Sequence, residues 1–156
     1  MPGLKTIVIG LGNPLLGDDG AGWKVASLLE KQEGMQNIKI EYVAEGGLRL
    51  MEIMIGYERA IIIDAIHVED AVAGSVRTFV LESLPNPFGG HLASSHETNL
   101  QTALQIGRMS GASLPSEVIV VAIESAHVYD FSEQLSPPVA QAIPLAAELI
   151  TKLVAG

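Results

Sequence analysis

The chain of 156 residues carries 18 acidic and 9 basic side chains, which gives a formal net charge of −9. This balance argues against a nucleic-acid partner, because phosphate backbones are bound by basic surfaces. The absence of cysteine excludes disulfides, thiolate metal ligands and a cysteine nucleophile.

The rest of the composition favours a single α/β domain. Hydrophobic residues make up 48% of the chain and charged residues only 17%, which is typical of a sheet covered by helices on both faces. We therefore predict one domain over residues 1–156. We find no apolar run near the ~20 residues of a membrane span and no signal-peptide cleavage pattern. We accordingly expect a cytoplasmic protein with no membrane partner, and we expect it to be a monomer.

Hydrophobic periodicity predicts strands that alternate with helices along the chain. The strand at 38–43 alternates apolar and charged residues, a pattern typical of an edge strand. The link 67–74 is too short for a helical crossover, which needs about a dozen residues or more, so strands 60–66 and 75–80 should pair antiparallel. The first, third and fifth strands are joined through helices and should be parallel, which makes the sheet mixed. The predicted strands are 5–10, 38–43, 60–66, 75–80 and 118–123, and the predicted helices are 18–31, 48–55, one from 94 and one from 137.

The stretch GLGNPLLGDDGAG, Gly10 to Gly22, predicts a strand end, a glycine-rich turn and a helix start. It is a poor phosphate site, because Leu15 stands where a dinucleotide fingerprint has its third glycine and adjacent aspartates would repel a pyrophosphate. One aspartate in a first helical turn is explained by capping or by the helix dipole. Two in succession leave one available for a ligand. Asp18 or Asp19 is then a candidate to bind a cation, with a capping role as the alternative.

Two more side chains are expected at the same edge of the sheet, where the parallel strands end. Asp64 lies near the end of strand 60–66, and a carboxylate among apolar residues is costly unless it is paired or bound to metal. The alternative for Asp64 is a structural role, in which it pairs with a cation or caps a neighbouring helix. Connectivity brings His96 to this edge, although a histidine in a first helical turn is also compatible with simple exposure. Oxygen and nitrogen donors of this kind suit a divalent ion such as zinc or nickel, which can assist peptide hydrolysis.

The other polar residues near this edge are weaker candidates. Glu124, just past strand 118–123, is interpreted as a solvated or loop-ordering carboxylate rather than a ligand. The remaining histidines are interpreted as loop residues, of which the first two are second choices as ligands: His67, His91 and His127.

Five motifs spread over nearly the whole chain are GLGNPLLGDDGAG, EGG at Glu45 to Gly47, IIIDAI at Ile61 to Ile66, SSHETNL at Ser94 to Leu100, and VVAIES at Val120 to Ser125. In this order and spacing they resemble the hydrogenase maturation endopeptidases, which remove a C-terminal extension from the large subunit of nickel-iron hydrogenases. The resemblance implies a metal-dependent or aspartic-type endopeptidase with Asp19, Asp64 and His96 as its metal-contacting and catalytic residues. Some members have Glu at the position of Asp19. It also implies a three-layer α/β/α fold with a twisted, mixed five-stranded sheet containing one antiparallel strand.

The resemblance further implies the partner and the metal. The expected partner is a nickel-loaded large-subunit precursor, so the nickel is carried by the substrate; the alternative is another divalent metal held by the enzyme itself. We expect Gly46, Gly47 and Phe88 to bind the substrate. Phe88 belongs to a Pro/Gly-rich loop at 81–95 that has no helical or strand period, and Leu92 is its second apolar candidate for contact with the precursor.

Two other functions fit parts of the sequence. A metal-binding checkpoint module without peptidase activity would bind the precursor and leave its mass unchanged. Peptidyl-tRNA hydrolases also begin with a strand followed by GLGNP, but they carry a His-Asn pair where this chain has Asp18 and Asp19. A net charge of −9 is also poorly suited to tRNA.

Overall fold

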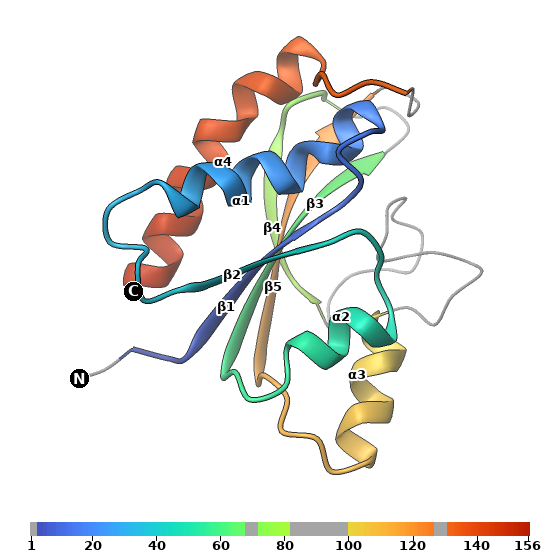
Figure 1. The fold of residues 1–156 in the computed structure, drawn as a ribbon, viewed down its shortest axis with the longest axis vertical. Coiled ribbons are helices and arrows are strands. Elements are labelled where there is room, and N and C mark those ends of the chain that lie inside the picture. The colour runs from blue at the N-terminus through green and yellow to red at the C-terminus, as the bar shows by residue number, and fades with distance from the viewer. Residues whose placement is uncertain (1–2, 68–71, 82–99, 127–130) are drawn as a thin grey trace.

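The computed structural model describes residues 3–67, 72–81, 100–126 and 131–156. These residues form a five-stranded sheet with the strand order β2-β1-β3-β5-β4. Figure 1 shows α1 and α4 on one face of the sheet and α2 and α3 on the other, which confirms the predicted α/β/α layers. The elements are β1 (Thr6–Leu11), the 3₁₀ helix η1 (Gly17–Gly20), α1 (Ala21–Glu30), β2 (Lys39–Val43), α2 (Leu48–Ile53), β3 (Arg59–His67), β4 (Val76–Val80), α3 (Leu100–Met109), β5 (Glu117–Ser125) and α4 (Pro137–Ala155).

The sheet is mixed, as predicted, but one predicted neighbour is wrong. Strands β2, β1, β3 and β5 are parallel, and β2 lies at the edge as its alternating sequence indicates. Strand β4 runs antiparallel, yet it pairs with β5 and not with β3. The burial of the two strands gives the physical reason. All but the first residue of β5 is buried, whereas β4 has no fully buried residue, so β5 takes the interior position and β4 the edge.

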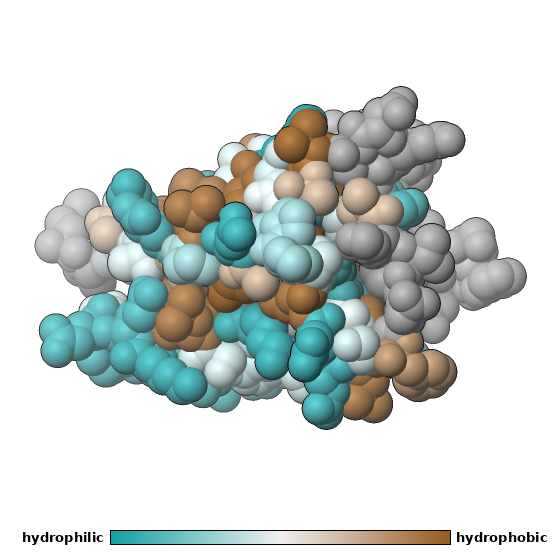
Figure 2. Space-filling model, turned by 90° about the horizontal axis from the view of Figure 1, so that it is seen from above, coloured by the Kyte–Doolittle hydropathy of each residue, from teal (hydrophilic) through white to brown (hydrophobic). Residues whose placement is uncertain are grey.

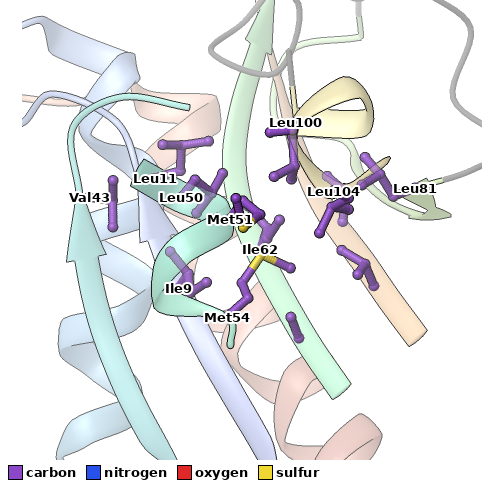
Figure 3. Packing of buried hydrophobic residues seen from close by; sticks show 14 of the residues in the cluster. Ile9, Leu11, Val43, Leu50, Met51, Met54, Ile62, Leu81, Leu100 and Leu104 are labelled. Atoms are coloured by element: carbon purple, nitrogen blue, oxygen red, sulfur yellow. The ribbon is translucent and has the colours of Figure 1, made fainter. Parts of the chain in front are cut away.

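Side-chain alternation along the strands divides the core between the two faces of the sheet. On the α2/α3 face, Figure 3 shows Met51 of α2 and Met54, the residue after α2, packed over Ile62 of β3, with Leu104 of α3 beside Leu81. The α1/α4 face has its own buried cluster, which includes Ile61, Ile63, Val121 and Ile123 from the central strands, Val25 and Leu29 from α1, and Val139 and Ile150 from α4. The central strands are therefore covered on both sides.

Helix α1 lies directly against the sheet because glycine stands where it crosses the strands. A Cβ atom on Gly22 would lie 2.4 Å from the carbonyl oxygen of Ile63 and 2.6 Å from that of Leu11. The single helix predicted at 18–31 is divided, since η1 precedes α1. The close crossing brings η1 into contact with β3.

Helix α4 is long and apolar enough, by length and composition alone, to cross a membrane, which amends the sequence-based statement that no stretch approaches this length. In the fold it packs on α1 and β5. Its exposed side carries an ion pair between Glu148 and Lys152, with oxygen and nitrogen 3.3 Å apart. Figure 2, which views the molecule from above, shows hydrophobic residues as separate patches among hydrophilic ones.

Candidate active site

The predicted acidic residues lie at the edge of the sheet where the parallel strands end. Asp19 belongs to η1, which follows β1, and Asp64 lies near the end of β3. Both are buried, with exposed fractions of 1% and 0%. Because η1 contacts β3, the segments that carry the two aspartates lie together, as the connectivity predicts.

The turn between β1 and α1 folds back on itself to place Asp19. The backbone N–H of Asn13 donates a 2.9 Å hydrogen bond to Oδ2 of Asp19. Gly12 has a φ of 145°, and a Cβ atom there would meet the carbonyl oxygen of Asp19 at 1.9 Å. Only glycine fits this position, so the second glycine of the motif exists to let the turn close on Asp19.

Asp18 is a structural residue, and this distinguishes it from its neighbour. Its Oδ2 accepts hydrogen bonds from the Ser125 hydroxyl at 2.7 Å and from the Ser136 hydroxyl at 2.8 Å. Its Oδ1 accepts the backbone N–H of Ser136, the residue before α4, at 2.7 Å. Asp18 therefore ties η1 to the end of β5 and the start of α4. Of the two adjacent aspartates, Asp19 is the one left as the metal-binding candidate.

Asp64 lies on the α2/α3 face of the sheet. In β3 it alternates with Ile62 and Ile66, both of which belong to the cluster on that face. Its register partner across the sheet is Ala122 of β5. Every residue of β3 except the last is buried, so Asp64 is a carboxylate in an otherwise apolar strand. A carboxylate in this setting needs a hydrogen-bonding or cationic partner.

Glu124 is not solvated, which corrects that part of its interpretation. It is 3% exposed, and its Oε1 lies 3.1 Å from Nε of Arg77 on β4. Its Oε2 is buried and has no hydrogen-bond partner among the described residues. Its backbone orders the start of β4, because Glu124 N–H donates to the carbonyl of Ser75 at 2.9 Å. Sequence reasoning missed Arg77, since a lone cation in an alternating strand is normally a solvent-facing residue.

Several predicted residues lie outside the part of the chain that the structure describes: His91, His96, Phe88 and Leu92 in 82–99, and His127 in 127–130. Among the residues it does describe, no group of three metal-ligating side chains occurs. His67, a second-choice ligand, is exposed at the end of β3.

Gly46 and Gly47 are buried between β2 and α2. The carbonyl of Gly47 accepts the N–H of Met51 at 3.1 Å, which starts α2. Its φ of 78° is an arrangement that favours glycine. Both glycines follow the carboxyl end of β2, at the same edge as Asp19, while their predicted role in substrate binding stays a prediction.

Comparison with known proteins decides the family. The sequence model of the HycI hydrogenase maturation proteases matches residues 24–153, most of the chain. The chain belongs to the hydrogenase maturation protease family. A Methanocaldococcus jannaschii protein, provisionally named a hydrogenase maturation protease, is 30% identical to it over 148 residues, covering 92% of each chain. The alignment with this relative also includes residues before residue 24, where the match to the family model begins.

Solved structures agree with this maturation protease in fold. The [NiFe] hydrogenase maturation protease HybD from Thermococcus kodakarensis superposes with a TM-score of 0.74 at 24% identity, covering 97% of this chain and 99% of its own. The hydrogenase maturating endopeptidase HybD from E. coli gives a TM-score of 0.73 at 22% identity, covering 94% and 90%. At 24% and 22% identity the two structures support the mixed five-stranded α/β fold. The roles of individual residues are argued from the geometry of this chain.

Proposed function

We propose that this maturation protease removes the C-terminal extension from the large-subunit precursor of a nickel-iron hydrogenase. The observation that carries the proposal is the pair of buried aspartates, Asp19 and Asp64, on contacting segments at one edge of the sheet. Family membership supplies the reaction class, an endopeptidase acting in hydrogenase maturation. We place the reaction in the cytoplasm and expect a monomer to carry it out.

The proposed roles follow from the chemistry of the donor set. Carboxylates of Asp19 and Asp64, with the imidazole of His96, provide oxygen and nitrogen donors for a divalent ion. Both carboxylates are buried, so a cation brought by the substrate would interact with them more strongly than it would in water. A cation bound there supplies positive charge that polarises a peptide carbonyl. The residues of the chain hold and orient the reacting group, while hydrolysis breaks the amide bond, adding hydroxyl to the carbonyl carbon and a proton to the leaving amine.

We propose that the nickel belongs to the substrate. Within the described residues the structure offers two aspartates and no cluster of three ligands, so the first shell is incomplete without groups from elsewhere. Ligands supplied by the precursor, together with His96, would complete it. Such an arrangement lets the enzyme distinguish a nickel-loaded precursor from an empty one. Gly46, Gly47 and Phe88 are the residues proposed to contact the precursor.

Intact mass spectrometry of a large-subunit precursor tests the proposal. The nickel-loaded precursor should lose the mass of its C-terminal extension after incubation with this protein, and the nickel-free precursor should keep it. An unchanged mass for the nickel-loaded precursor, together with a stable complex, would instead establish the checkpoint module without peptidase activity.

A further inference from the structure

A cation lies in register with Asp64 at the candidate active site. Asp64 of β3 pairs with Ala122 of β5, and Ala122 pairs in turn with Arg77 of β4. Residues in register on neighbouring strands project from the same face, so all three belong to the α2/α3 face. Since adjacent strands are about 4.8 Å apart, the backbones at Asp64 and Arg77 are roughly 10 Å apart, and Ala122 is the residue in register between them.

A buried carboxylate fixes the orientation of Arg77. Nε of Arg77 lies 3.1 Å from Oε1 of Glu124, whose side chain is 4% exposed, whereas the side chain of Arg77 is 57% exposed. Glu124 follows Ala122 by two residues on β5 and therefore lies on the same face, nearer the sheet edge. The ion pair is formed through Nε of the guanidinium. No hydrogen bond from its two terminal nitrogens to another described residue is observed.

The chemistry of this group suits an oxygen acceptor on a peptide. A guanidinium presents a planar fork of N–H donors that matches carboxylate and carbonyl oxygens, and it stays charged at any working pH. The chain has a net charge of −9, which on balance disfavours the approach of a peptide carboxylate. Arg77, which is half-exposed and in register with Asp64, provides a positive charge that attracts a carboxylate at this edge.

We propose that Arg77, oriented by Glu124, binds a carboxylate or carbonyl oxygen of the precursor peptide next to the bond that is cleaved. The inference rests on the proposed function, because it assumes that this edge of the sheet receives the precursor. Arg77 then contributes to substrate binding, and Glu124 is a positioning residue that acts through it. Substrate recognition thus extends from β3 across β5 to the edge strand β4.

The test uses variants that do not leave a buried charge alone. Removing Arg77 by itself would strand the Glu124 carboxylate, so the main variant is the double substitution Arg77→Met with Glu124→Gln. The matched control is Lys39→Met with Glu41→Gln, which removes the exposed 3.2 Å ion pair on β2 at the opposite edge of the sheet. Thermal melts establish that both double variants are folded. KM and kcat for the nickel-loaded precursor, and its Kd by biolayer interferometry, are measured for each.

We expect the Arg77 double variant to raise KM and Kd about tenfold, the lower end of the range for a hydrogen bond to a charged group, with kcat little changed. Glu124→Gln alone, which keeps the cation but loosens its orientation, should raise KM less. A folded Arg77 double variant that binds and processes the precursor as well as the control would overturn the proposal. Wild-type protein that binds the precursor but leaves it uncleaved would contradict the proposed function. In that case the Kd values still test whether Arg77 binds the precursor.

A second substrate identifies the acceptor. Amide substitutions of every Asp and Glu in the C-terminal extension remove its side-chain carboxylates. If Arg77 binds one of these, the wild-type Kd rises to that of the double variant, whose own Kd does not change. If Arg77 binds a backbone carbonyl, the amide substitutions affect neither protein and the difference between the two proteins is retained. Both results support a peptide acceptor.

Discussion

Replacing Gly22 with alanine tests how tightly α1 is seated on the strands that carry the active site. The added Cβ would lie 2.4 Å from the carbonyl oxygen of Ile63 and 2.6 Å from that of Leu11. Carbon and carbonyl oxygen normally come no closer than about 3.3 Å, so α1 would have to move by roughly 1 Å. Both obstacles are backbone atoms of central strands and cannot rotate away.

The expected cost combines two opposing effects. Overpacking of a core typically costs about 1–3 kcal/mol, and rigid backbone neighbours place this site at the upper end. Alanine regains about 1 kcal/mol of helix propensity over glycine. The net loss is therefore about 2 kcal/mol, which for a domain of this length lowers Tm by roughly 4–8 °C. Processing should fall as well, since Ile63 precedes Asp64 and Leu11 leads into the turn that carries Asp19.

Circular dichroism melts and urea denaturation of three glycine variants provide the assay. Gly3→Ala adds a Cβ with no atom within 4 Å and should leave Tm unchanged. Gly111→Ala also meets no atom, but its φ of +88° costs about 1 kcal/mol from backbone strain alone. A Tm for Gly22→Ala equal to that of Gly3→Ala would refute the close seating of α1.

Three further predictions concern Asp18, metal binding by the free protein, and Tyr42. Asp18→Ala should lower the free energy of unfolding by about 1–3 kcal/mol in urea melts, because it leaves the Ser136 N–H without its acceptor, whereas Asp18→Asn should cost less. Equilibrium dialysis should find no tight, stoichiometric nickel or zinc site in the protein alone, because two carboxylates and one imidazole, with no thiolate, leave coordination positions that the substrate must fill. Burial and the 2.7 Å hydrogen bond to Glu30 raise the pKa of Tyr42 from 10.0 to about 12. This favours the neutral phenol in the folded state, so its stabilisation is complete below pH 10 and is lost as the pH rises to about 12; Tyr42→Phe should flatten that decline in pH-dependent melts.

Much of the fold could be predicted because its signals are local. Strand and helix periodicity predicted the five strands and the edge position of β2. The lengths of the connections predicted that the first, third and fifth strands are parallel and that β4 is antiparallel. The buried face of α3 was also predictable, since Leu100, Ala103 and Leu104 have helical spacing and are all buried. Placement of Asp64 at the sheet edge followed from the same local patterns.

The neighbour of β4 was not predictable from the length of its connection. A short link sets strand direction and an upper bound on reach, but it does not say whether another strand lies between the two that it joins. The insertion of β5 between β3 and β4 depends on segments far apart in sequence. The ion pair between Glu124 and Arg77 could not be predicted for the same reason, because it forms only when β4 lies beside β5.

The distinction between Asp18 and Asp19 likewise required the folded chain. Two adjacent aspartates are equivalent to any argument from residue type. Their roles separate because Ser125 and Ser136, which lie 107 and 118 residues from Asp18 in sequence, surround that side chain in the fold. Asp19 instead accepts an N–H from its own turn.

The central claim is that the buried carboxylate of Asp64 is needed for cleavage rather than for folding. Intact mass spectra of the nickel-loaded precursor, recorded after incubation with wild-type protein, Asp64→Asn or His96→Ala, measure this directly. We predict that only the wild-type protein shortens the precursor. Both variants should have the same Tm and far-ultraviolet circular dichroism as the wild-type protein. Asp64→Asn that cleaves at the wild-type rate would contradict the catalytic role, and Asp64→Asn that unfolds would show that the carboxylate is structural.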